Sequence, residues 1–154
     1  MRCFSGILYL MVGVIVFTID RLSKLYALSF WYDQPSIVNR FLSFEVTFNR
    51  GISWGMLHSE SNTIFIFVLF INSCITAFLV WYAYYRFTQR NSIFGEILVI
   101  IGSFSNIVDR IYYHGVVDFI LFSYNQWSFP VFNVADVAIV IGVGIILYQQ
   151  GIKS

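Results

Sequence analysis

A run of 25 residues without a charged side chain, Ser61 to Tyr85, restricts the possible folds more than any other feature of this sequence. Because the hydrocarbon core of a bilayer is about 30 Å thick and a helix rises about 1.5 Å per residue, about 20 apolar residues can cross it. Three other apolar segments carry charges only near their ends: residues 4 to 28, 93 to 110 and 134 to 150. We therefore expect an all-α polytopic membrane protein with four transmembrane helices in a single domain, residues 1 to 154.

The composition agrees with a membrane protein and excludes other classes of function. Apolar residues make up 58% of the chain and charged residues 11%, whereas soluble domains have about 45–50% and about 25%. The formal net charge of +1 provides no basic surface, so no nucleic-acid partner is expected. Cys3 and Cys74 lie in apolar runs without the spacing of a disulfide or metal site. We expect neither a metal ion nor another cofactor.

The segment between the first two apolar runs contains a strand pattern. In "FLSFEVTFN", the apolar side chains of Leu42, Phe44, Val46 and Phe48 alternate with polar ones. This period of two is typical of a half-buried strand. We expect a small β-sheet, formed largely by residues 41 to 48, on the outer membrane surface.

The distribution of basic residues predicts the orientation. With four spans both chain ends share one side, and the short loop on that side, residues 86 to 92, contains Arg86 and Arg90. Short loops rich in Lys and Arg remain in the cytoplasm. We therefore expect both termini in the cytoplasm and the two long connections, residues 29 to 60 and 109 to 133, on the outer side.

Carboxylates gather at the outer ends of the predicted spans: Asp20, Asp109, Asp118 and Asp136. Charged groups in membrane spans are costly, so they are functional candidates by default. Asp136 also has a structural explanation, since "NVAD" places Asn133 at a helix N-cap and Asp136 at N3. The adjacent Arg110 and nearby Asn106 suggest an ion-paired, structural Asp109. Asp118 has no local partner and no capping pattern.

Two carboxylates that share a dry site can perform catalysis, because like charges in contact tend to share one proton. One carboxylate then acts as a general base on water while the other, protonated, polarises a carbonyl. Two alternatives remain open from the residues alone. The first is a small transporter or proton-relay subunit that uses Asp20, Asp118 and Asp136, and the second is a structural scaffold with capped helix ends.

Five motifs together resemble a known family: "IDRLSK" (residues 19–24), "NRGISWG" (49–55), "SNIVDR" (105–110), "GVVDF" (115–119) and "FNVAD" (132–136). They occur in the order and spacing of the lipoprotein signal peptidases, or signal peptidase II. The resemblance covers residues 20 to 142. It departs from the family pattern at Phe104, which replaces a small residue, and at Ser53 and Trp54, which replace Ala and Phe.

The resemblance implies an aspartic endopeptidase of the bacterial inner membrane with its active site near the outer face. Its substrate is a prolipoprotein, cleaved on the N-terminal side of a diacylglyceryl-modified cysteine. The implied catalytic pair is Asp118 and Asp136. Membrane lipid surrounds the protein, a lateral opening between helices is implied, and we expect a monomer. Supporting or substrate-positioning roles fall to Asp20, Lys24, Asn49, Gly51, Asn106, Asp109, Arg110 and Asn133.

The local setting suggests different roles for the two aspartates of this pair. The dipole of the fourth helix favours an ionised Asp136 at its N-terminus. The apolar surroundings of Asp118 are expected to raise its pKa and keep it protonated. Asp136 would then act first as the base and Asp118 as the acid, although such a pair titrates as one unit.

Overall fold

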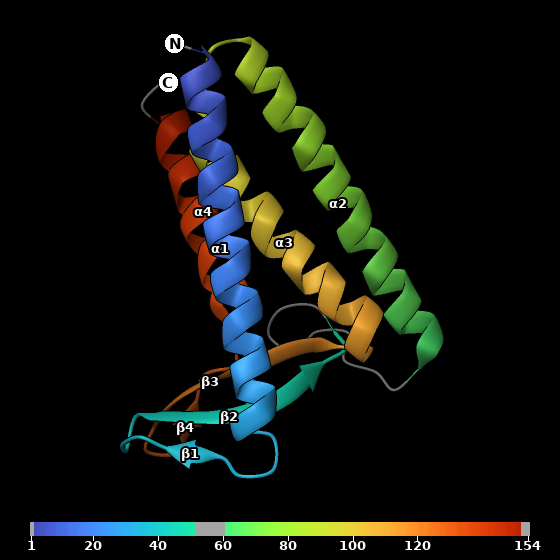
Figure 1. Ribbon diagram of the computed structural model, residues 1–154. Coiled ribbons are helices and arrows are strands. Elements are labelled where there is room, and N and C mark those ends of the chain that lie inside the picture. Colours follow the sequence, from blue (N-terminus) through green and yellow to red (C-terminus); the bar gives the residue numbers. More distant parts are fainter. Residues whose placement is uncertain (1, 52–60, 152–154) are drawn as a thin grey trace.

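The computed structural model describes residues 2–51 and 61–151, which form a helical bundle with a small sheet at one end (Figure 1). The polypeptide is mostly helical, as expected. The start of α1 and the end of α4 lie at the end of the bundle opposite the sheet (Figure 1). The elements, in chain order, are α1 (Arg2–Phe30), β1 (Ser36–Ile37), β2 (Leu42–Asn49), α2 (Asn62–Thr88), α3 (Phe94–Tyr113), β3 (Val116–Tyr124), β4 (Trp127–Ser128) and α4 (Val134–Gly151).

Each predicted span is a helix, but the helices differ in how apolar they are. Within the described residues, three are long and apolar enough to cross a membrane: Gly6–Phe30, Asn62–Thr88 and Val134–Gly151. Their outward surfaces expose many large apolar side chains, which suits contact with lipid. The 20-residue helix α3 is not among the three, because it contains Glu96, Asp109 and Arg110. All three charged side chains are buried inside the bundle.

Helix α3 is the centre of the bundle and contacts the other three helices. It lies close to α4 because glycines face each other. A Cβ added to Gly142 would meet the Gly95 carbonyl oxygen at 2.6 Å, and one added to Gly102 would meet the Ala135 carbonyl oxygen at 2.6 Å. Small residues of this kind let helix backbones approach closely in membranes. The first turn of α4 is therefore held against the middle of α3.

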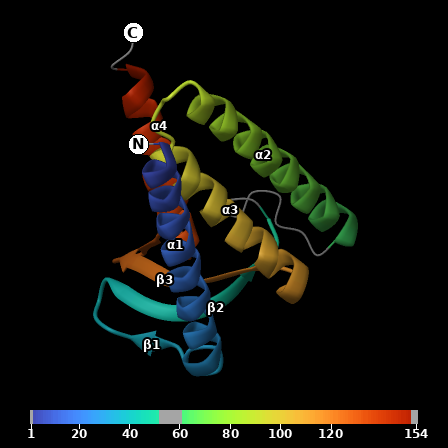
Figure 2. The same ribbon diagram turned by 45° about the horizontal axis from the view of Figure 1, so that its top comes forward.

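Helix α2 stands apart from the compact group of α1, α3 and α4 (Figures 1 and 2). Its packing partner is α3. At the end away from the sheet, the buried Arg86 pairs with Glu96 of α3 and donates a hydrogen bond of 3.1 Å to Gln149 of α4. In the sequence Arg86 indicates only the orientation of the protein, whereas in the structure it connects three helices.

The predicted strand is confirmed as β2, in a four-stranded antiparallel sheet of order β1-β2-β3-β4. Its strict alternation is interrupted, however. Phe44 pairs with Ile120 and Thr47 pairs with Asp118, so β2 has one extra residue between these positions. Such a bulge reverses the faces beyond it. Thr47 and Asn49 therefore share a face with Phe44, where unbroken alternation would have placed them on the opposite face.

Strand β3 was not predicted, because residues 109–133 were interpreted as a connecting loop. It follows the left-handed C-cap of α3 at His114, which has a φ of 55°. At the next residue, Gly115, an added Cβ would meet the Cβ of Phe48 at 3.1 Å. The backbone therefore passes close to β2 where it enters the sheet. Trp31, just after α1, stacks on Phe44 with ring centroids 4.2 Å apart and thereby fixes the sheet to the bundle.

Candidate active site

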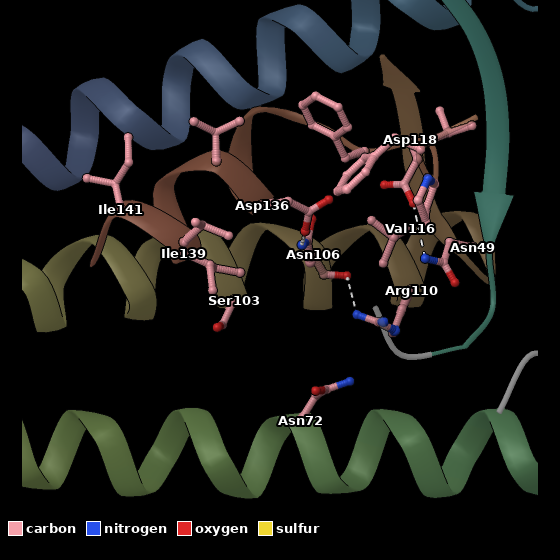
Figure 3. Close-up of a pocket in the computed structure, with 16 residues that line it drawn as sticks. Asn49, Asn72, Ser103, Asn106, Arg110, Val116, Asp118, Asp136, Ile139 and Ile141 are labelled. Carbon is pink, nitrogen blue, oxygen red and sulfur yellow. Dashed lines mark hydrogen bonds between the residues drawn. The ribbon is translucent and has the colours of Figure 1, made fainter. Parts of the chain in front are cut away.

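Asp118 and Asp136 face one cavity of about 330 Å³ at the junction of the sheet and the bundle (Figure 3). Asp118 is the third residue of β3, and Asp136 lies in the first turn of α4. Asp118 is almost fully buried, whereas Asp136 is half-buried. The structure thus brings together the two aspartates that the sequence analysis paired.

The cap predicted for α4 is present. The backbone N–H of Asp136 donates to Asn133 Oδ1 at 2.9 Å, and the backbone N–H of Asn133 donates to Asp136 Oδ2 at 3.2 Å. This reciprocal pair is a capping box, which satisfies two backbone donors at the helix start. The other carboxylate oxygen of Asp136 accepts a hydrogen bond of 2.9 Å from Asn106 of α3. Capping therefore orients Asp136 and leaves its carboxylate beside the cavity.

Two asparagines hold Asp118. Asn133 Nδ2 donates to Asp118 Oδ1 at 2.6 Å, and Asn49 Nδ2 donates to Asp118 Oδ2 at 3.1 Å. The bulge in β2 explains the second contact, because it places Asn49 on the same face as Asp118. Burial raises the pKa of Asp118 to about 7, with the neighbouring Asp136 charge adding to the effect and the two asparagine hydrogen bonds opposing it. An aspartate with this pKa can carry a proton at neutral pH.

Lys24 neutralises the buried side of the site. Its ammonium lies 2.8 Å from Asp20 and 2.7 Å from Asp109, and it donates a hydrogen bond of 2.8 Å to Asn106 Oδ1. Asp109 also pairs with Arg21 at 2.5 Å. The prediction of an ion-paired Asp109 is confirmed, but its expected partner, Arg110, is wrong. Both partners come from α1, so the ion pairs join α1 to α3.

Asp20 and Asp109 also accept hydrogen bonds that position the elements carrying the aspartate pair. Asp20 Oδ1 accepts the backbone N–H of Ala135 at 2.7 Å, and Asp20 Oδ2 accepts the Ser105 hydroxyl at 2.6 Å. Asp109 Oδ2 accepts the backbone N–H of Val117 at 3.2 Å. Each structural carboxylate thus lies against the backbone next to one of the paired aspartates. Arg21 and Ser105 were missed as members of this cluster, although both lie within the quoted motifs.

Arg110 lines another side of the cavity, and Gly51 lies behind it. The guanidinium of Arg110 donates to the Gly51 carbonyl at 2.8 Å and to the Asn106 carbonyl at 3.5 Å. Gly51 in turn donates its backbone N–H to Asn49 Oδ1 at 3.0 Å. This chain of contacts orients the asparagine that binds Asp118. Ser53 and Trp54 of the same motif lie outside the described residues.

The remaining cavity walls have unequal polarity. Helix α4 and the preceding segment contribute apolar side chains, whereas Asn72 of α2 and Ser103 of α3 add polar ones (Figure 3). Neither polar residue was predicted from the sequence, although the amide within the uncharged run of α2 was a visible signal. Phe104, the family departure, points away to α1, where its ring centroid is 5.9 Å from that of Phe17. Within the described part of the chain, no cluster of His, Cys, Asp or Glu side chains is placed to hold a metal ion.

Solved structures share this fold. One chain, solved as a bacterial membrane enzyme by the in meso method at 2.3 Å resolution, aligns with a TM-score of 0.74 and 25% identity, over 92% of this chain and 86% of that chain. A second bacterial membrane enzyme, at 1.9 Å resolution, aligns with a TM-score of 0.70 and 25% identity, over 92% and 91%. The chain therefore shares the fold of bacterial membrane enzymes.

The particular family follows from the sequence comparisons. The chain belongs to the family described as Signal peptidase (SPase) II, whose sequence profile matches residues 12–151. A protein named lipoprotein signal peptidase from Polynucleobacter necessarius subsp. necessarius (strain STIR1) is 31% identical over 155 residues, covering 100% of this chain and 95% of the relative. A protein of the same name from Wigglesworthia glossinidia brevipalpis is 35% identical, with coverage of 92% and 93%. The chain is thus a membrane protease, and its family and apolar helices fit a multi-pass protein of the inner membrane.

Proposed function

We propose that this protein is an aspartic endopeptidase that removes the signal peptide from prolipoproteins, on the N-terminal side of a diacylglyceryl-modified cysteine. The observation that carries the proposal is the meeting of Asp118 and Asp136, from two different elements, at one cavity. Family membership supports the substrate class. The alternatives of a proton relay and a structural scaffold have no support among the relatives.

In the proposed mechanism the ionised Asp136 removes a proton from a water molecule, whose oxygen attacks the scissile carbonyl carbon. Asp118, protonated because of its raised pKa, donates its proton to the carbonyl oxygen and forms a tetrahedral diol. The diol then returns a proton to Asp118 as its C–O double bond re-forms. The C–N bond breaks, and the departing nitrogen takes the proton held by Asp136. Both aspartates end in their starting states.

The polar residues around the pair have proposed supporting roles. Asn133 and Asn49 hold Asp118, and Asn106 holds Asp136, so the attacking water would meet two oriented carboxylates. Lys24 offsets the charge of the neighbouring structural carboxylates, Asp20 and Asp109. Arg110 and Gly51 shape the cavity next to Asn49.

We propose four membrane spans: the three long apolar helices α1, α2 and α4, together with α3. The 20 residues of α3 are about 30 Å long, enough to cross the hydrocarbon core, and its charges face the bundle interior. Both termini would lie in the cytoplasm, and the sheet and aspartate pair at the outer face of the inner membrane. The substrate's signal helix would enter sideways from the lipid. We propose that the chain acts as a single domain, residues 1 to 154, and as a monomer.

The test is cleavage of a synthetic prolipoprotein by the purified protein, with and without the diacylglyceryl group on cysteine. We expect cleavage of the lipidated form alone. Asp118→Asn should reduce kcat by at least about a thousandfold, because the acid in the mechanism is lost. Asp33→Asn, which alters an exposed aspartate, is the matched control and should cleave normally. Near-normal cleavage by a folded Asp118→Asn variant would exclude the aspartate-pair mechanism.

A further inference from the structure

Helix α2 carries an amide within its apolar run that the proposed reaction does not use. Asn72 lies in a helix long and apolar enough to span the membrane, and it lines the cavity opposite α3 (Figure 3). Polar side chains in such spans usually bond to a neighbouring helix or to their own backbone. Ser73 and Thr76, on the same helix, follow this pattern by donating to the Leu69 and Asn72 carbonyls at 2.8 and 2.7 Å. The Asn72 side chain has no hydrogen-bond partner among residues 2–51 and 61–151.

Ser103 of α3 is a second such group. It lines the same cavity one helical turn before Asn106, which binds Asp136. Its hydroxyl also has no hydrogen-bond partner in the described ranges. Asn72 and Ser103 therefore present unused donors and acceptors to the cavity, next to the aspartate pair and on its membrane side.

The part of the cavity wall that α4 contributes has a different chemistry. It is formed by Val137, Ile139, Val140 and Ile141 of α4, which offer contact surface but no hydrogen bonds. An occupant that fits this cavity must offer hydrogen-bonding groups to α2 and α3 and an apolar surface to α4 (Figure 3). An extended peptide has this character, since its backbone can face Asn72 and Ser103 while its side chains face α4. An acyl chain would offer no hydrogen-bond partner to the amide or the hydroxyl.

The proposed reaction, on which this inference rests, requires such a peptide. A scissile bond inside a helix has its carbonyl hydrogen-bonded, so the substrate must unwind near the cleavage point. Within the bilayer, unwound backbone is tolerated only where protein groups satisfy its N–H and C=O groups. The residues N-terminal to the scissile bond lie on the membrane side, where the cavity offers Asn72 and Ser103. We propose that these two side chains are positioning residues that bind the backbone of the signal peptide just before its cleavage site.

The experiment measures kcat and KM of the full chain in detergent with a lipidated prolipoprotein peptide. Asn72→Leu, of similar size, should raise KM about tenfold and leave kcat within about twofold. This corresponds to about 1.4 kcal/mol, the strength of one neutral hydrogen bond. Ser103→Ala should raise KM in the same direction. Ser73→Ala, whose hydroxyl bonds only within its own helix, is the matched control and should change neither constant. An unchanged KM for Asn72→Leu, or a fall in kcat alone, would overturn the inference.

A second measurement changes the substrate in place of the enzyme. Single backbone amides N-terminal to the scissile bond are replaced in turn by esters, which removes one N–H donor each time. One such ester should lower kcat/KM about tenfold with the unsubstituted enzyme and less than twofold with Asn72→Leu. Equal losses with both enzymes, or no loss at any position, would refute backbone binding by Asn72. Failure of the unsubstituted enzyme to cleave the all-amide lipidated peptide would instead refute the proposed function.

Discussion

The substitution Lys24→Met would remove a fully buried ammonium group that contacts three side chains. The surrounding cluster contains two carboxylates, Asp20 and Asp109, and two cations, Lys24 and Arg21. Without Lys24, Asp20 has no ion-pair partner among the described residues, because Arg21 pairs with Asp109. Removing one partner of a buried ion pair costs about 3–5 kcal/mol. We expect the free energy of unfolding to fall by this amount.

Thermal unfolding of the purified protein in detergent measures the effect. A loss of about 3–5 kcal/mol corresponds to a decrease in Tm of about 6–20 °C for a chain of this size. The double substitution Asp20→Asn/Lys24→Met leaves one carboxylate with one cation, so it should recover at least about half of the loss. Arg40→Met, which removes an exposed cation, should change stability by less than about 0.5 kcal/mol. A Lys24→Met loss below about 1 kcal/mol, or a double variant less stable than the single one, would refute the reasoning.

Two further predictions concern stability. The pKa of Asp118 is about 7 in the fold against 3.8 for the free side chain, so its protonated form stabilises the fold most below about pH 4, and this contribution is lost as the pH rises to about 7. Asp118→Asn should flatten the Tm profile between these values, and an unchanged slope would contradict the shift. Gly142→Ala places a Cβ against the Gly95 carbonyl and should cost about 1–3 kcal/mol in thermal unfolding. Gly144→Ala, whose added Cβ would have nothing within 4 Å, should be neutral or stabilising. Equal Tm values for the two variants would contradict the close approach of α3 and α4 at Gly142.

The helices could be predicted from the sequence because membrane spans require long uncharged runs, and such runs have clear ends. The run from Ser61 to Tyr85 is contained almost entirely in α2, Asn62–Thr88. Strand β3 lacked a comparable signal. Both faces of its first part are buried, so Val116, Val117 and Phe119 are all apolar. The sequence there has no alternation of apolar and polar residues that would predict a strand.

The partner of Asp109 could not be predicted from adjacency. Neighbouring residues on a helix point about 100° apart, so Asp109 and Arg110 face different neighbours. Asp109 faces α1 and meets Lys24 and Arg21, whereas Arg110 faces Gly51. These contacts join residues far apart in the chain, and local pattern contains no information on them.

The cap at the start of α4 is different, because it depends only on a four-residue spacing. Asn133 and Asp136 could therefore be assigned to their positions from the sequence. The meeting of Asp136 with Asp118 was expected from the family resemblance and not from local pattern. It depends on the sheet register and on the glycine contacts between α3 and α4, which only the fold reveals.

The side chain of Asn133 contacts both aspartates through its two chemically different ends. Its NH2 group donates to Asp118, and its carbonyl oxygen accepts the backbone N–H of Asp136. The amide cannot rotate by 180° without facing donor to donor on one side and acceptor to acceptor on the other. Conversion of Asn133 to aspartate would replace the NH2 donor by a carboxylate oxygen. It would add a third acid to Asp118 and Asp136 without changing the size of the residue. The orientation of both aspartates therefore depends on the amide group of a residue that takes no part in bond breaking.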